Sequence, residues 1–83
     1  MHPRVAAVDV VPPFALRLRF SDGSVGMVDL AAWLAGRGGV FLPLQDPAFF
    51  AQVTLDREAG TVVWPNGVDL DADVLFETAV PID

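Results

Sequence analysis

Residues 15–20, together with the turn that follows them, restrict the fold of this chain more than any other feature. In this segment apolar residues alternate with Arg17 and Arg19, so a strand here has one apolar face and one basic face. Asp22 and Gly23 come next, and an Asp-Gly pair after such a run is typical of a hairpin turn, because glycine adopts positive φ at little cost. The sequence therefore predicts a β-hairpin with one buried face.

The rest of the chain adds short elements around this hairpin. Strands are predicted, in chain order, over residues 4–11, 15–20, 25–29, 53–56, 61–64 and 68–70. Short helices are predicted over 30–34, in a turn after Asp46, and over 72–78, and residues 79–83 form a tail. Gly26 indicates a bulge or a closely approaching backbone. The predicted fold class is α+β, a small antiparallel β-meander with two or three short helices packed mainly on one face.

Turn and cap residues fix the ends of several elements. Asp46 precedes Pro47, which favours a helix start with proline at its first position. Asp71 is the predicted N-cap of the last helix, which directs Val74, Leu75 and Phe76 inward; Asp29 has the same role for the first helix. Asn66 and Gly67 predict a tight turn after Pro65.

Length and charge limit what the protein can be. With 83 residues, the chain is expected to form one domain over residues 1–83. The net charge is −6 and lysine is absent, which makes direct binding of nucleic acid improbable because duplex binding depends on cationic phosphate contacts. No apolar run reaches the length of a membrane span. The absence of cysteine excludes disulfides and thiolate zinc sites and agrees with a cytoplasmic location.

One acidic cluster, Asp69, Asp71 and Asp73, is a candidate metal or ligand site. An EF-hand loop counted from Asp69 would need glycine at its sixth position and glutamate at its twelfth, and the chain has Val74 and Val80 there. A magnesium site built from two of these carboxylates stays an alternative. Capping of the last helix is the simpler interpretation.

Catalytic constellations are hard to assemble from this sequence. The one histidine, His2, lies next to the N-terminus, and without a second histidine or a cysteine a nucleophile and base are difficult to pair. A carboxylate pair such as Asp22 with Asp29 is explained by turn and cap roles. The glycines of residues 36–39 lack the Gly-Lys-Ser/Thr of a phosphate loop. We therefore expect no catalytic residue, no metal and no cofactor.

Bulky apolar residues are abundant for so small a domain, which favours an exposed interaction patch. Trp64 ends a strand before a tight turn and is expected in the core. Trp33 lies on a short helix beside the glycine-rich loop and is a candidate interface residue, since tryptophan is enriched at interface centres. Arg17 and Arg19 form a basic stripe that is either a solvated strand face or a docking surface for an acidic partner or a second copy.

The order of several short motifs resembles one family. Phe20-Ser21-Asp22-Gly23 is followed by Asp29-Leu30, then Asp46-Pro47, then Trp64-Pro65-Asn66-Gly67 and Leu75-Phe76-Glu77. This set, over about residues 4–78, resembles the bacterial family known as domain of unknown function 2442. Ala72 and Phe76 stand where many members carry proline and tyrosine, so a polar role at Phe76 is not expected.

The resemblance implies an α+β domain without an established catalytic site, in some members joined to a DNA-binding domain and in others encoded in arrangements suggestive of toxin–antitoxin pairs. The leading hypothesis is a non-catalytic interaction or regulatory module, antitoxin-like, that binds another small, basic protein, with self-association as a further option. Charge complementarity with a basic partner would speed their encounter. The alternative is a metal- or ligand-binding domain that uses the Asp69, Asp71 and Asp73 cluster.

Overall fold

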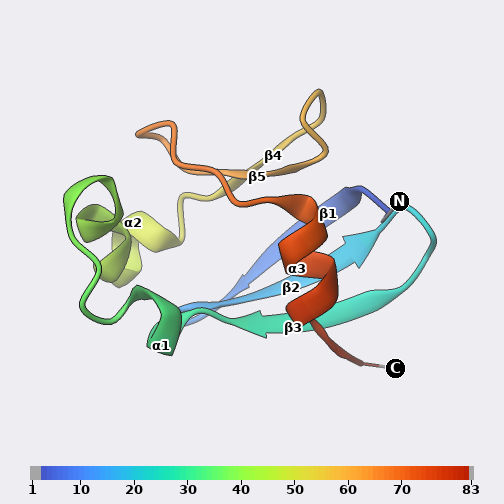
Figure 1. Cartoon of the computed structure of the whole chain (residues 1–83), viewed down its shortest axis with the longest axis horizontal. Helices are drawn as coiled ribbons and strands as arrows, with labels where there is room; N and C mark the ends of the chain where they lie inside the picture. Colours follow the sequence, from blue (N-terminus) through green and yellow to red (C-terminus); the bar gives the residue numbers. More distant parts are fainter. Residues whose placement is uncertain (1–2, 83) are drawn as a thin grey trace.

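Four antiparallel strands form the main sheet of the computed structural model, which describes residues 3–82 (Figure 1). The strands lie in the order β1 (Val5–Val11), β2 (Ala15–Phe20), β3 (Val25–Asp29) and β6 (Val80–Pro81). In β2, Leu16 and Leu18 are buried whereas Arg17 is exposed, as the alternation predicts. The α+β meander is thereby confirmed.

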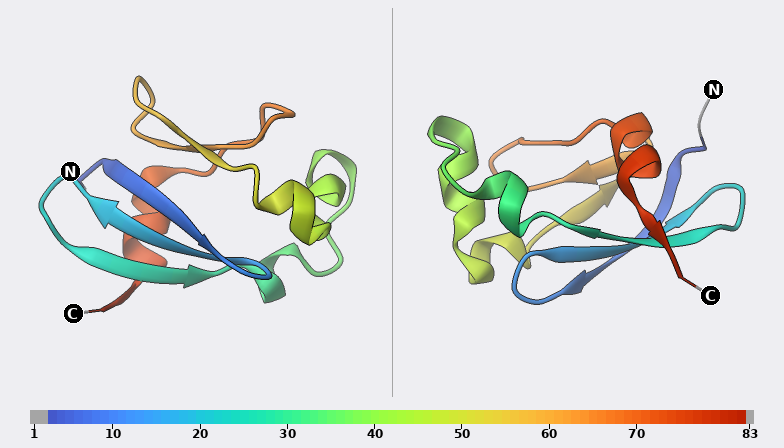
Figure 2. Two further views of the ribbon diagram at one scale, coloured as in Figure 1. Left: turned by 180° about the vertical axis from the view of Figure 1, so that it is seen from behind. Right: turned by 60° about the horizontal axis from the view of Figure 1, so that its bottom comes forward.

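A second sheet pairs β4 (Thr54–Asp56) with β5 (Thr61–Val63). The views in Figure 2 place this hairpin and the last helix on one side of the main sheet. The strand predicted over residues 68–70 is reduced to a single bridge between Val63 and Asp69. Asp71, two residues after the bridge, is already the N-cap of the last helix, so no longer pairing forms.

Short helices connect and cover the sheets. They are α1 (Ala31–Leu34), the 3-10 helix η1 (Gly39–Gln45), α2 (Pro47–Phe50) and α3 (Ala72–Thr78). The carboxylate of Asp46 accepts a hydrogen bond from the backbone N–H of Ala48 at 3.0 Å, and that of Asp71 accepts one from Asp73 at 2.9 Å. Both predicted N-caps are thus confirmed, and α3 has the predicted bounds.

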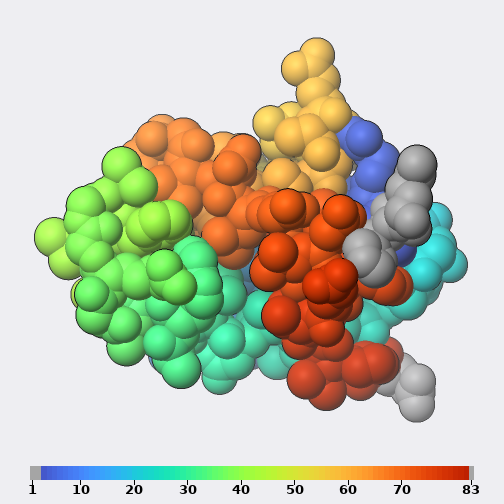
Figure 3. Space-filling model, in the orientation of Figure 1, coloured from blue at the N-terminus to red at the C-terminus, as the bar shows by residue number. Residues whose placement is uncertain are grey.

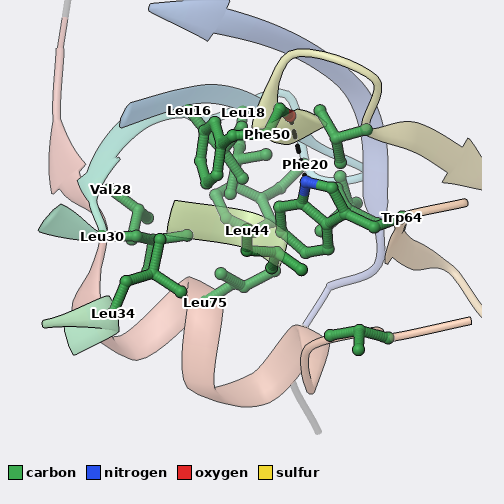
Figure 4. Close-up of a cluster of buried hydrophobic side chains, with 14 residues drawn as sticks. Leu16, Leu18, Phe20, Val28, Leu30, Leu34, Leu44, Phe50, Trp64 and Leu75 are labelled. Atoms are coloured by element: carbon green, nitrogen blue, oxygen red, sulfur yellow. Dashed lines mark hydrogen bonds between the residues drawn. The ribbon is translucent and has the colours of Figure 1, made fainter. Parts of the chain in front are cut away.

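One apolar cluster lies between the main sheet and these elements (Figure 4). Trp64 is 2% exposed, and its indole Nε1–H donates a hydrogen bond to the carbonyl of Phe50 at 3.0 Å. Phe50 in turn packs edge-on against Phe14, with ring centroids 5.6 Å apart. Trp64 is therefore a core residue, as expected, and its one polar group is satisfied.

The C-terminal segment differs from the prediction. Residues 79–83 were expected to be a tail, but Val80 and Pro81 form β6 and pair with Met27 and Gly26 of β3. A Cβ on Gly26 would lie 2.8 Å from the Cβ of Ala79. Gly26 thus allows the close approach of backbone that its position indicated, and this approach is what brings the segment onto the sheet.

The inward face of α3 is narrower than predicted. Leu75 is 1% exposed and Phe76 packs edge-on against Phe20 at 5.0 Å. Val74, which was expected to face inward, is 53% exposed. A helix of two turns offers one stripe to the core, and Leu75 and Phe76 already occupy it.

Arg4 connects the start of β1 to the hairpin between β4 and β5. Its guanidinium donates hydrogen bonds to the carbonyls of Arg57 at 2.9 Å and Glu58 at 2.6 Å. The next residue, Val5, donates its N–H to the carbonyl of Gly60 at 2.9 Å. These contacts hold the second sheet against the first.

No helix within residues 3–82 is long and apolar enough to cross a membrane. His2, the one histidine of the sequence, lies outside the described residues.

Candidate functional site

An apolar groove of about 460 Å³ runs between the α1–η1 segment and α3. Figure 3 shows the face on which these segments meet, with residues 30–45 in green, residues 64–71 in orange and α3 in red. The floor of the groove is formed by Val28, Leu30 and Leu75, which are all buried. We call it the Trp33 groove, after the largest side chain that lines it.

Trp33 and Phe41 form one wall of the groove. Their rings meet edge-to-face, with centroids 5.2 Å apart at an interplanar angle of 89°. Arg37 stacks over Trp33 with its guanidinium carbon 4.1 Å from the ring centroid, and its Nε–H donates to the Trp33 carbonyl at 2.6 Å. The side-chain amide of Gln45 donates to the carbonyls of Leu34 and Arg37. The contacts of Arg37 and Gln45 therefore hold this wall in place.

The opposite wall is α3. Val74 and Thr78 are one helical turn apart and both line the groove. The hydroxyl of Thr78 donates to the Val74 carbonyl at 2.8 Å, so it is already used within the helix. The side chain of Val74 is 53% exposed because it faces this groove and the solvent above it.

Three carboxylates, Asp29, Asp69 and Asp71, also line the groove. Asp29 accepts a hydrogen bond from the N–H of Ala31 at 2.9 Å, so it supports the start of α1 although the N-cap position itself is Leu30. Asp71 caps α3 in the same manner. The three exposed acids give the groove an acidic rim, and backbone hydrogen bonds hold two of them, Asp29 and Asp71, in place.

The candidate metal cluster does not form a metal-binding geometry. Among residues 3–82, no three acidic or histidine side chains converge on a point where a metal ion could be held. Asp69, Asp71 and Asp73 instead border an open depression beside Arg4. The capping role of Asp71 explains its position.

The structure separates the residues that the sequence suggested as an interface. Arg17 and Arg19 lie on the outer face of the main sheet and line a shallow depression of about 230 Å³ with Asp9. Within residues 3–82 no element covers this face (Figure 2). Trp33 borders the groove on the other side of the sheet, so the arginines and the tryptophan belong to two surfaces.

The predicted turn residues have structural roles. The carboxylate of Asp22 accepts hydrogen bonds from the Ser24 hydroxyl at 2.6 Å and the Ser24 N–H at 2.9 Å, and these bonds lower the pKa of Asp22 below its usual 3.8. Gly23 and Gly67 have φ of +89° and +86°, which favours glycine. Asn66 donates its amide to the Val40 carbonyl at 2.9 Å and so ties its turn to η1.

Among the groove residues that the sequence did not indicate are Phe41, Leu70 and Val74. Phe41 and Leu70 are far apart in the chain, and only the tertiary fold brings them to the same groove. Val74 carried a signal, because it adds a second apolar position beside Leu75 on a helix too short to bury both.

A scan against protein-family models matches residues 5–81 to the family described as "Protein of unknown function (DUF2442)". Neither the curated proteins nor the solved structures contain a match to this chain. Because the match extends over nearly the whole chain and agrees with the motif order and the α+β fold, the protein belongs to the DUF2442 family.

Proposed function

We propose that the protein is a non-catalytic interaction module, regulatory and antitoxin-like in role, that binds a small basic partner protein in the Trp33 groove. The observation that supports this most directly is the groove itself. It combines an apolar lining, an exposed apolar side chain at Val74 and a rim of carboxylates. Protein interfaces have this anatomy, with an apolar centre that contains aromatic residues and a polar edge.

Charge supports the same partner class. The net charge of −6 favours association with a basic protein, because opposite charge raises the rate of encounter. The chain has no cysteine, which suits a reducing compartment, and we place the module in the cytoplasm on that ground.

A capture experiment with matched variants tests the proposal. Tagged wild-type protein, Val74→Glu and Val80→Glu are used to capture proteins from lysate of the source organism, with mass spectrometry and light scattering of each eluate. Both substitutions add one negative charge at an exposed valine, but Val80 lies on β6, away from the groove. Val80→Glu therefore controls for the introduced charge.

We expect a stoichiometric partner with wild type and Val80→Glu and its loss with Val74→Glu. Equal capture by all three proteins, or no stoichiometric partner with any of them, would contradict the assignment of the groove. If light scattering shows a homo-oligomer that only Val74→Glu disrupts, the partner is a second copy and the basic-partner proposal is wrong.

A further inference from the structure

The shape of the Trp33 groove restricts what can fill it. One wall is a helix whose Val74 and Thr78 form an i, i+4 ridge beside the groove. Such ridges pack into the grooves between side chains of another helix. With seven residues, α3 is about 10 Å long, which matches about two turns of an incoming helix.

A partner strand has a less suitable surface here. Strand addition requires a sheet edge with unpaired backbone groups. β3 runs beside α3, and Gly26 and Met27 are paired with β2 on one side and β6 on the other. The β3 residues that line the groove, Val28 and Asp29, are paired with β2 alone, so the open edge of β3 at the groove is two residues long. An edge of two residues is short for strand addition, and the two walls of the groove are side chains from the α1–η1 segment and α3.

The acidic residues around the groove indicate which charge the polar side chains of the ligand carry. Asp29, Asp69 and Asp71 line it together with apolar side chains. Lysine and arginine pack their apolar stems along an apolar surface while their charged ends reach outward. Arg37 is engaged by the ring and the carbonyl of Trp33, and it stiffens the wall rather than lining the groove.

From these observations we infer that the occupant of the groove is an amphipathic, basic helix of the partner, with its apolar side chains between Trp33 and Val74 and its lysines or arginines against the acidic rim. This inference rests on the proposed function and adds to it the secondary structure and charge pattern of the binding segment.

The probe is a fluorescein-labelled peptide of leucine and lysine, about 18 residues long so that it can form a helix, with leucines at helical spacing. A second peptide has the same composition with leucines at every other position, as in a strand. A third replaces lysine with glutamate. Binding to the full chain is followed by fluorescence anisotropy at about 0.15 M salt.

Two protein variants locate the charge effect. Asp29→Asn/Asp69→Asn/Asp71→Asn removes the acidic rim and keeps the caps, since asparagine caps as well as aspartate. Asp9→Asn/Asp22→Asn/Asp46→Asn makes the same change in net charge away from the groove. The helical lysine peptide should bind wild type and the second variant within about twofold of each other, and the rim variant about tenfold more weakly.

The strand-spaced and glutamate peptides should each bind at least about tenfold more weakly than the helical lysine peptide. Equal binding of the two lysine peptides, equal loss in the two triple variants, or no binding of the helical peptide would overturn the inference. Any of these results, together with a natural partner whose capture is lost with Val74→Glu, would refute the helical, basic occupant. The proposed function would still stand.

Discussion

The guanidinium of Arg4 fills the space that a side chain at Gly60 would need. A Cβ on Gly60 would lie 2.6 Å from the Arg4 Nε, and Gly60 also has φ of +69°. The two residues are 56 positions apart and join the start of β1 to the β4–β5 hairpin.

This relationship predicts the cost of Gly60→Ala. The substitution introduces both backbone strain and a steric clash, and we expect it to lower the free energy of unfolding by about 2 to 3 kcal/mol. Urea denaturation gives the value. Gly67→Ala is the control, since Gly67 has φ of +86° but nothing within 4 Å of the added Cβ; it should cost about 1 to 2 kcal/mol. If both variants lose the same free energy of unfolding, the Arg4 side chain moves aside without a loss of stability.

A second prediction concerns the pairing of β6 with β3. Gly26→Ala places a Cβ 2.8 Å from that of Ala79, so β6 should separate from β3. The N–H of Ile82 donates to the Val25 carbonyl at 3.0 Å, and its hydrogen exchange should become faster in this variant. The double variant Gly26→Ala/Ala79→Gly removes the closest contact and leaves the one to the Val80 carbonyl oxygen at 3.3 Å, so exchange should return most of the way to the wild-type rate. Unchanged protection of Ile82 in Gly26→Ala would refute the explanation.

The two tryptophans should differ strongly in their contribution to stability. Trp64→Phe leaves a cavity and removes the donor to the Phe50 carbonyl, and we expect a loss of about 2 to 4 kcal/mol. Trp33→Phe keeps an aromatic ring in a half-buried position and should cost less than about 1.5 kcal/mol. Each variant retains one tryptophan, so fluorescence during urea denaturation reports both. A larger loss of stability for Trp33→Phe than for Trp64→Phe would show that Trp33 contributes more to the core than Trp64.

Protonation of Asp22 at acidic pH should lower the stability of the fold. Hydrogen bonds from the Ser24 hydroxyl and N–H lower the pKa of Asp22 in the folded state. The stabilisation is therefore present above the unfolded value of 3.8 and is lost as the pH falls through the lower folded-state pKa. The difference in Tm between wild type and Asp22→Asn should shrink as the pH falls from about 7 to about 2.

The cause of this shift can be checked separately. Ser24→Ala removes the hydroxyl donor, so the pKa of Asp22, followed by NMR of its carboxyl carbon, should rise toward 3.8. A Tm difference that stays constant over the whole pH range would show that Asp22 acts through something other than its charge.

Local features of the fold could be predicted from the sequence because they depend on neighbouring residues. The alternation in β2 and the Asp46 and Asp71 caps involve contacts within a few positions, and each is present in the structure. The family was also identifiable, since its motifs are contiguous and ordered along the chain.

Features that depend on distant residues were not predictable in this way. β6 has two residues, and its pairing with β3 needs the space left by the missing Cβ of Gly26, more than 50 positions earlier. The Trp33 groove likewise needs Phe41, Leu70 and Val74 from three separate segments. Trp33 could be singled out as a large side chain on a short helix, but its partners in the groove could not.

Two carboxylates that line the groove, Asp29 and Asp71, accept a backbone N–H through an oxygen atom, a role that does not need their charge. Asp29 and Asp71 each accept one N–H, and an amide oxygen would do so equally well. Exchange of aspartate for asparagine at these positions therefore alters the electrostatics of the surface while the helix starts stay intact. Such an exchange thus changes the charge of this surface without a compensating change in the framework.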